Sequence, residues 1–300
     1  MKQERIGHPA RPHVDALNAV GYCVIDDLLP LASVQALAQD LDRDFCQTPV
    51  SQGPFYGADT VRFGGLLGKS THAAAFVQHP LVLDIVENIL GPWCDTIQLN
   101  LTQAIEIRPG AERQVPHRDQ DMWRASRMLP ATHEAEFLVN VMWPFTPYTT
   151  ENGSTILWPG SHRRRAEDLI DPSEAVSLAI SPGSALLFLG STLHSGGANR
   201  TIAARRGMIV SYSLGWLKPY EIQTLVYPPD TARDFSPELA ALIGYQVHRP
   251  NLGNVDGRCP SHLLHGERHL GAVDALADAQ IALIQAFREQ ATEPETVSGG

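Results

Sequence analysis

Between residue 97 and about residue 217 the chain reads as a run of short strands, and this pattern constrains the fold more than any other feature. Apolar and polar residues alternate through 97–102, as expected of a strand with one face in water. Turn-forming pairs such as Asn152-Gly153 separate the later candidates. The predicted strands are 97–107, 138–144, 154–158, 176–180, 184–189 and 207–214. Short strands at this spacing predict a mainly β core, a double-sheet jelly roll or barrel, and not a parallel sheet of βαβ units.

Helical periodicity and irregular segments flank this β core. The other predicted elements in the N-terminal part are a loose tail over 1–15, a strand over 21–27, a helix over 31–45, a long loop over 47–70 and a helix over 81–89. After Tyr220 the sequence becomes irregular and ends in a helix that carries Val273 and Phe287, followed by a polar tail over 289–300. No linker-like change of composition divides the chain. We therefore expect one domain over 1–300, with the β core at about 97–217 and helices packed outside it.

Charge and composition exclude several classes of function. The formal net charge of −10 disfavours a nucleic-acid partner, because such proteins need clustered Lys and Arg. The one basic run, 162–165, is short and typical of a solvated loop. Four scattered cysteines, the absence of an apolar leader and the absence of a long apolar run are typical of a soluble cytoplasmic protein with reduced thiols and no membrane segment.

The sequence His117-Arg118-Asp119 has the spacing of a metal site. In an extended segment, residues two positions apart project to the same side of the backbone, so the imidazole and the carboxylate can grip one ion. With a second histidine, the result is a 2-His-1-carboxylate face with three open positions, the site type of non-haem Fe(II) oxygenases. A lone His-x-Asp arises easily by chance in a chain with 12 histidines and 33 acidic residues, so the remaining parts must come from elsewhere.

His194 and Arg205 are the candidates for those parts. His194 follows the apolar run 185–189, and the glycines after it let the backbone pass close to a bound group. Standing alone, it would fit a core or turn histidine better. Arg205 opens an apolar strand, where a buried guanidinium needs an anionic partner and matches a carboxylate with two parallel hydrogen bonds. Arg206 beside it points to the other face and is expected to be solvated.

Taken in order, these motifs resemble the phytanoyl-CoA dioxygenase family. The resemblance covers roughly residues 15–260, and the motifs that carry it are His117-x-Asp119, Glu151-Asn152-Gly153-Ser154-Thr155, Pro159-Gly160-Ser161-His162, His194-Ser195-Gly196-x-x-Asn199 and Arg205. It implies a double-stranded β-helix core (jelly roll, cupin-like) with flanking helices. It also implies an oxygenase that depends on Fe(II), 2-oxoglutarate and O₂.

The resemblance further implies roles for individual residues. The implied iron ligands are His117, Asp119 and His194, and the implied clamp for the distal carboxylate of 2-oxoglutarate is Arg205. Gln114 and Thr155 match positions that contact this cosubstrate in some members, although either side chain also fits an ordinary structural place.

His162 and Met142 are two positions to which the resemblance gives no ligand role. His162 has the chemistry of a ligand, but the family pattern puts it in a turn away from iron. Many members carry a tryptophan where this chain has Met142, and Trp143 comes next. Because neighbouring strand residues face opposite sides, either the cavity wall is reshaped or the register is shifted.

The implied chemistry is oxidation of a C–H bond, with release of succinate and CO₂. Related halogenases have a small residue at the position of Asp119, so hydroxylation is expected here. Substrate contacts are expected from Gln120, Asp121, Met122 and Trp123, which follow the first ligands, and from Arg62 and Lys69, unless these two lie in a solvated loop. The expected substrate is a small amphipathic molecule or natural-product intermediate.

Two other classes of function fit parts of the pattern. One is a jelly-roll protein that binds a small molecule without catalysis, and the full set of three ligands with Arg205 argues against it. The other is a cupin-like metal isomerase or hydrolase with the same three ligands. Such an enzyme has no need of a buried dicarboxylate clamp, so Arg205 distinguishes the oxygenase from this second alternative.

Overall fold

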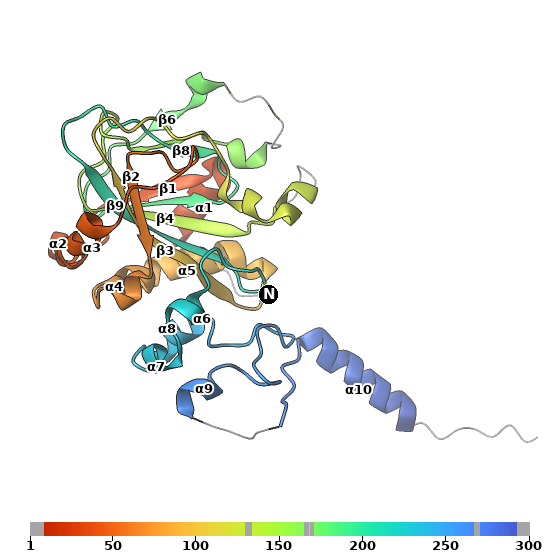
Figure 1. Cartoon of the computed structure of the whole chain (residues 1–300). Coiled ribbons are helices and arrows are strands. Elements are labelled where there is room, and N and C mark those ends of the chain that lie inside the picture. Colours follow the sequence, from red (N-terminus) through yellow and green to blue (C-terminus); the bar gives the residue numbers. More distant parts are fainter. Residues whose placement is uncertain (1–8, 130–133, 165–167, 169–170, 267–270, 293–300) are drawn as a thin grey trace, which may run out of the picture.

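The computed structural model describes residues 9–129, 134–164, 168, 171–266 and 271–292, and within them two antiparallel sheets carry the fold (Figure 1). The larger sheet has the strand order β1-β7-β4-β9-β3-β2, and the smaller has the order β6-β5-β8. The strands of the larger sheet are β1 Tyr22–Ile25, β2 Thr60–Gly64, β3 Ile97–Ile107, β4 Leu138–Pro144, β7 Ala185–Leu189 and β9 Arg205–Leu214. Those of the smaller sheet are β5 Thr155–Leu157, β6 Val176–Ser177 and β8 His194–Gly196.

Apolar side chains of both sheets meet between them. Ile105 of β3, Leu186 of β7 and Leu157 of β5 belong to one buried cluster. The two sheets therefore enclose a common interior, which is the arrangement that the sequence predicts.

Strand β4 shows that the larger sheet is buried on both of its faces. All seven residues of this strand are buried. Val139, Val141 and Trp143 join the core on the helical side, whereas Met142 joins the cluster between the sheets. This division follows from the alternation of side chains along a strand, and it leaves no face of β4 in water.

Helices cover the outer face of the larger sheet (Figure 1). Helix α5 (Pro80–Leu90) packs on β4 and β9. It buries Val82, Ile85, Val86 and Ile89, which lie at the spacing of one helix face. The other helices in the N-terminal part are α1 Arg11–Val20, α2 Leu31–Asp40, α3 Asp42–Gln47 and α4 Ala73–Val77.

The remaining helices are short, apart from the last. After β9 come α6 Gln223–Val226, α7 Pro229–Ala232, α8 Pro237–Leu242, α9 His262–His265 and α10 Asp278–Thr292. Turns of 3-10 helix are η1 Leu66–Gly68, η2 Gly91–Trp93, η3 Asp119–Met122, η4 Arg124–Met128, η5 Ser161–Arg163 and η6 Pro172–Glu174.

The segment Ala73–Trp93 is long and apolar enough to cross a membrane by length and composition alone. It joins α4, α5 and η2, and its helix is interrupted at Gln78 and His79. Because the apolar face of α5 lies in the core, we assign the segment to the interior of the fold.

Two predictions for the N-terminal part were wrong. Residues 11–15 belong to α1 and not to a loose tail, because Leu17 is buried and Gly21 ends the helix in a left-handed conformation with φ 88°. Residues 60–64 form β2 and not a loop, and they pair with β3. Gly and Pro residues around this short strand concealed its pattern. Since β1 also pairs with β7, the β core begins well before residue 97.

Two predicted elements are broken or shortened. The predicted helix over 31–45 is divided into α2 and α3 at Leu41. The predicted strand over 176–180 is limited to β6 and a single bridge between Ile180 and Tyr148.

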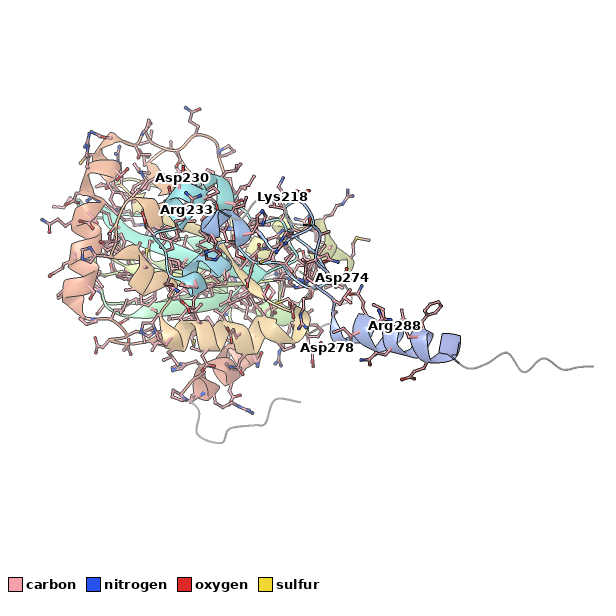
Figure 2. All side chains as sticks on the ribbon, turned by 90° about the horizontal axis from the view of Figure 1, so that it is seen from below. Lys218, Asp230, Arg233, Asp274, Asp278 and Arg288 are labelled. Carbon is pink, nitrogen blue, oxygen red and sulfur yellow. The ribbon has the colours of Figure 1, made fainter. Side chains whose placement is uncertain are left out.

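The prediction for the C-terminal helix was wrong in its start and in its packing. Helix α10 begins at Asp278, so Val273 precedes it, and the predicted polar tail from Glu289 is still helical at its start. The helix leaves the body of the molecule, with Asp278 at its base (Figures 1 and 2). Leu283 and Phe287 are 70% and 71% exposed. Helical periodicity identifies an apolar face but not what covers it.

Candidate metal centre and active site

Backbone hydrogen bonds hold His117 and His194 side by side. The N–H of each residue donates to the carbonyl oxygen of the other, at 2.9 Å in both directions. His194 opens β8, which pairs with β5 in the smaller sheet. The two residues, which are distant in sequence, thus form an isolated antiparallel β-bridge. The centroids of their imidazole rings lie 4.3 Å apart.

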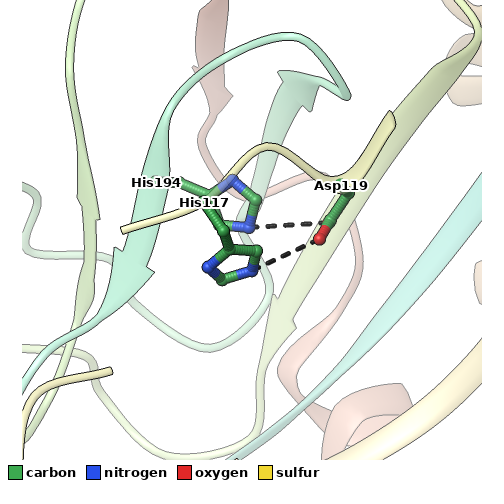
Figure 3. Close-up of side chains that lie close together, drawn as sticks. All are labelled: His117, Asp119 and His194. Carbon is green, nitrogen blue, oxygen red and sulfur yellow. Dashed lines mark ion pairs between the residues drawn. The ribbon is translucent and has the colours of Figure 1, made fainter. Parts of the chain in front are cut away.

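Asp119 completes the cluster (Figure 3). Its Oδ1 lies 3.3 Å from Nε2 of His117, and its Oδ2 lies 3.5 Å from Nε2 of His194. One ligand atom from each of the three residues lies within 4.8 Å of the other two. Arg118 between the first two ligands is extended, with φ −115° and ψ 125°. Both ligands therefore turn to one side, as the His-x-Asp spacing predicts.

Neighbouring groups fix the orientation of all three ligands. Nδ1 of His117 donates to the carbonyl oxygen of Val115 at 2.9 Å, and Nδ1 of His194 donates to that of Thr192 at 3.1 Å. A carbonyl can only accept, so each neutral ring keeps the lone pair of its Nε2 for a metal. Asn140 Nδ2 donates to Oδ2 of Asp119 at 2.9 Å and holds the carboxylate in place.

Burial and mutual attraction set the charges of the ligands. Burial alone would raise the pKa of Asp119, but the two histidines and Asn140 outweigh it and lower that pKa to about 2. Burial lowers the pKa of His194 to about 4. Burial also acts to lower the pKa of His117, yet the hydrogen bond and charge of Asp119 raise it above its ordinary value. An ionised carboxylate beside imidazole nitrogens is the donor set that a divalent metal needs, so the residues present fit an iron ion.

The ligands line a cavity of about 120 Å³ between the two sheets. The predicted cosubstrate contacts Arg205, Gln114 and Thr155 line the same cavity, as does Arg62. Gln114 Oε1 accepts a hydrogen bond from the N–H of Gly196 at 3.2 Å. The rest of the lining is apolar or polar without formal charge, and it consists of Phe55, Tyr56, Asn100, Leu101, Gln103, Ile105, Ile107, Met122, Leu138, Asn140, Met142, Phe188, Ser195, Gly196, Ile209, Ser211 and Tyr220.

Arg205 brings a buried positive charge into this cavity. Only 2% of the residue is exposed, and its guanidinium lies 3.6 Å from the centroid of the Tyr148 ring. Its Nε has no hydrogen-bond partner, and no carboxylate in the described part of the chain forms an ion pair with it. Burial accordingly lowers the pKa of Arg205. A buried charge in this state is costly unless an anion joins it.

Arg62 is a second cation in the cavity. It donates from Nη1 to Gln103 Oε1 at 3.1 Å, while its buried Nε has no partner among the described residues. Burial lowers the pKa of Arg62, and the charges of Arg205 and Asp119 both act on it. Arg62 therefore interacts electrostatically with Arg205 and with Asp119.

Arg206 lies on the opposite face of β9 from Arg205. It was expected to be solvated, but it is half-buried and forms ion pairs with Glu106 at 2.6 Å and Asp42 at 2.8 Å. Acidic side chains from β3 and α3 thus compensate this arginine, which leaves Arg205 as the uncompensated member of the pair.

Four residues predicted to contact substrate lie outside the cavity lining. Lys69 forms an ion pair with Asp44 at 2.5 Å, and Asp121 forms one with Arg127 at 3.6 Å. Gln120 is buried, and Trp123 donates from Nε1 to the carbonyl oxygen of Lys218 at 2.9 Å. The other two predicted contacts, Arg62 and Met122, are among the lining residues.

The structure also locates His162 and the neighbouring residues Met142 and Trp143. Nε2 of His162 donates to the carbonyl oxygen of Asn18 at 3.2 Å, away from the metal cluster. Met142 lines the cavity, whereas Trp143 packs edge-on against Phe76 in the helical layer, with ring centroids 5.2 Å apart. Met142 therefore forms part of the cavity wall, and Trp143 does not.

Four side chains at this site were missed from the sequence. Asn140 holds Asp119, and the ring of Phe55 lies edge-on to that of His117, with centroids 4.7 Å apart. The hydroxyl groups of Tyr56 and Tyr220 are hydrogen-bonded to each other beside the cavity. The signals available were the aromatic pair 55–56 in a Gly- and Pro-rich segment and a lone Asn in an apolar strand, since a buried polar side chain needs a partner.

One family model matches most of the chain. The model described as phytanoyl-CoA dioxygenase (PhyH) matches residues 17–207, a segment that includes the three candidate metal ligands and Arg205. The chain belongs to the phytanoyl-CoA dioxygenase family. The chain is also 29% identical to dioxygenase FrzG from Cladobotryum sp over 280 residues, which cover 84% of this chain and 90% of FrzG.

Solved structures support the fold of this phytanoyl-CoA dioxygenase family member. The epimerase SnoN from nogalamycin biosynthesis, in complex with Fe³⁺, α-ketoglutarate and nogalamycin RO, matches 73% of this chain and 89% of its own at a TM-score of 0.56 and 17% identity. HygX from Streptomyces hygroscopicus, with nickel and 2-oxoglutarate bound, matches 70% of this chain and 89% of its own at 0.57 and 14%. At these identities the likeness shows the fold alone, and it confirms the jelly-roll core.

Proposed function

We propose that this protein is an iron- and 2-oxoglutarate-dependent dioxygenase that oxidises a C–H bond of an uncharged small molecule, with release of succinate and CO₂. The observation that carries the proposal is the buried guanidinium of Arg205, which shares a cavity with the three metal ligands and has no carboxylate partner among the described residues. A metal triad alone fits several classes of enzyme. A triad together with a buried cation that has no carboxylate partner fits an enzyme that binds an anionic cosubstrate.

In this proposal the triad would bind the metal and the two arginines would bind the cosubstrate. His117, Asp119 and His194 would hold Fe(II), and when bound the iron would supply oxygen activation coupled to decarboxylation of 2-oxoglutarate. Arg205 would bind the distal carboxylate of 2-oxoglutarate as a planar fork. Arg62 would face the carboxylate at the other end, because it lines the same cavity as Asp119 and Arg205.

This assignment changes the expected role of Arg62 and narrows the substrate. Once both arginines face the cosubstrate, the rest of the lining offers amide and hydroxyl groups and apolar surface. A carboxylate or phosphate on the substrate would meet no counter-charge there, and burying it would be costly. The site therefore suits an uncharged apolar skeleton that carries hydroxyl or carbonyl groups, such as a natural-product intermediate.

Hydroxylation is the outcome we expect, because Asp119 leaves no ligand position for a halide. The structural neighbour SnoN is named an epimerase, so the same fold also serves other oxidative outcomes. A cupin-like isomerase or hydrolase is disfavoured by Arg205, whose charge it does not require. A non-catalytic binding protein is disfavoured by the presence of all three candidate ligands together with Arg205. We expect the enzyme to act in the cytoplasm, in line with its scattered cysteines.

The test is turnover of 2-oxoglutarate. Metal-free protein would be mixed anaerobically with Fe(II) and 2-oxoglutarate, exposed to O₂, and assayed for succinate with and without a panel of uncharged terpenoid, polyketide and alkaloid compounds. We expect slow succinate release that a substrate accelerates, and none from the Asp119→Ala variant, which lacks the only anionic ligand. Wild-type protein that binds neither metal nor 2-oxoglutarate would contradict the proposal.

A further inference from the structure

One side chain between the metal ligands has no part in the proposed chemistry. Arg118 points away from the cavity, because alternation in an extended segment turns it opposite to His117 and Asp119. It is only 9% exposed. Its Nε donates to the carbonyl oxygen of Ser191 at 2.9 Å, and its Nη2 donates to that of Ser161 at 3.1 Å. The guanidinium therefore holds two backbone positions that are remote from its own segment.

Both acceptors belong to the structure that supports the third ligand. Ser191 lies in the turn that leads from β7 to His194. The hydroxyl of Ser161 accepts a hydrogen bond from the N–H of Leu193, the residue before His194, at 2.8 Å. Arg118 thus fastens the segment that carries the first two ligands to the turn that carries the last.

The same turn is held from its other side. The hydroxyl of Ser191 donates to the carboxyl group of Glu136, with Oγ–O distances of 2.7 Å and 2.8 Å. The N–H of Gln120, next to Asp119, donates to the carbonyl oxygen of Gly190 at 3.1 Å. With these contacts in place, the turn has little freedom to move relative to the first two ligands.

The choice of arginine follows from this geometry. Burial lowers the pKa of the Arg118 guanidinium, and the charges of Asp121 and Asp168 act in the opposite direction. Its direct hydrogen bonds go to the two carbonyl oxygens. A planar fork presents donors in fixed directions and can reach two carbonyls at once, whereas an ammonium group is a single point.

We propose that Arg118 is a positioning residue of the metal centre, which sets the place of His194 relative to His117 and Asp119 and thereby the affinity for a divalent metal. The inference rests on the proposed function only in requiring that these three residues bind a metal. Removal of groups that orient metal ligands typically weakens metal binding about 10- to 100-fold.

The experiment measures metal binding without turnover. Metal-free wild-type protein and the variants Arg118→Gln and Arg118→Lys would be titrated with Co(II), whose visible spectrum reports ligand geometry. The matched control is Arg206→Gln, because Arg206 is also a multiply bonded, partly buried arginine but lies on the outer face of β9. We expect roughly 10- to 100-fold weaker Co(II) binding and an altered spectrum for Arg118→Gln, an intermediate loss for Arg118→Lys, and wild-type affinity for the control.

Other results would overturn the inference. Wild-type affinity in Arg118→Gln would show that the fork does not position the ligands, and an equal loss in Arg206→Gln would show only general destabilisation. If Arg118→Gln does not fold by circular dichroism, Arg118→Lys and Ser161→Ala, which removes the hydroxyl that holds Leu193, decide the question in the same titration. Wild-type protein that does not bind Co(II) would reject the metal site itself, together with the proposed function.

Discussion

Two adjacent arginines on β9 illustrate how a fold assigns different roles to identical side chains. Arg206 faces the helical layer and meets Glu106 and Asp42. Arg205 faces the interior, where its guanidinium packs on the ring of Tyr148 and forms no ion pair with a carboxylate of the described residues. Because a buried charge without an anion is unfavourable, this residue predicts that an anion from outside the chain completes the site.

Replacement of Arg205 by alanine should therefore weaken 2-oxoglutarate binding. A hydrogen bond to a charged group contributes about 1.5–3 kcal/mol, so the concentration of 2-oxoglutarate needed for half-maximal succinate formation should rise roughly 10- to 100-fold. The Arg206→Ala variant is the control, and its requirement should stay at the wild-type level. If the two variants behave alike, the clamp lies elsewhere.

At this scale, the site residues that lie in motifs of informative spacing were predicted from the sequence. The side chains that only folding brings to the site were missed. The His-x-Asp pair, His194 and Arg205 are recognisable because their order and setting are informative. Arg62 and Lys69 fall in one predicted loop, yet strand β2 brings Arg62 to the cavity while Lys69 binds Asp44. No spacing rule separates the two, because β2 is too short to show a period.

At the scale of elements, the long strands were predictable, whereas two of the short strands were missed. Strands β3, β4 and β9 run for 7 to 11 residues and show continuous or alternating apolar patterns. Strands β2 and β8, with five and three residues, show no such pattern and were not predicted. Strand β8 lies in the smaller sheet beside β5, so the strand that presents His194 was not visible in the sequence, although β5 and β6 of the same sheet were.

Helix α10 should be dispensable for the stability of the body. Leu283 and Phe287 are largely exposed, and the ion pair between Arg249 and Asp278 at its base involves an Asp278 side chain that is 90% exposed. Exposed pairs contribute about 0–1 kcal/mol, so truncation after Ala277 should lower the midpoint of thermal unfolding by no more than about 4 °C. Differential scanning fluorimetry would measure it. A much larger drop would mean that α10 covers apolar surface of this chain or of a second copy.

For the molecule as a whole, Glu136 is expected to make stability depend on pH. This carboxyl group is buried beside Ser191, and burial raises its pKa to about 8. In the unfolded chain a glutamate ionises near pH 4.3. Below that pH both states are protonated. Between the two values the unfolded state alone loses its proton, so the free energy of unfolding falls as pH rises and levels off above about pH 8.

The Glu136→Gln variant should remove this dependence. Glutamine can still accept the hydroxyl of Ser191 but does not ionise. Urea unfolding between pH 5 and pH 8 should show a variant that gains stability over the wild type as pH rises, by more than about 1 kcal/mol at pH 8. A difference between the two proteins that is constant over this range would mean that Glu136 is already ionised in the folded state.

The backbone bridge between His117 and His194 also has a consequence for the stage of folding at which the candidate metal site can form. The two residues lie far apart in the sequence and are joined by an isolated antiparallel bridge, and contacts between residues so far apart are slow to form during folding. Before that bridge forms, His117 and Asp119 offer only two of the three candidate ligands. If the three residues bind a metal as proposed, tight binding requires a folded chain, and metal affinity reports whether this bridge has formed.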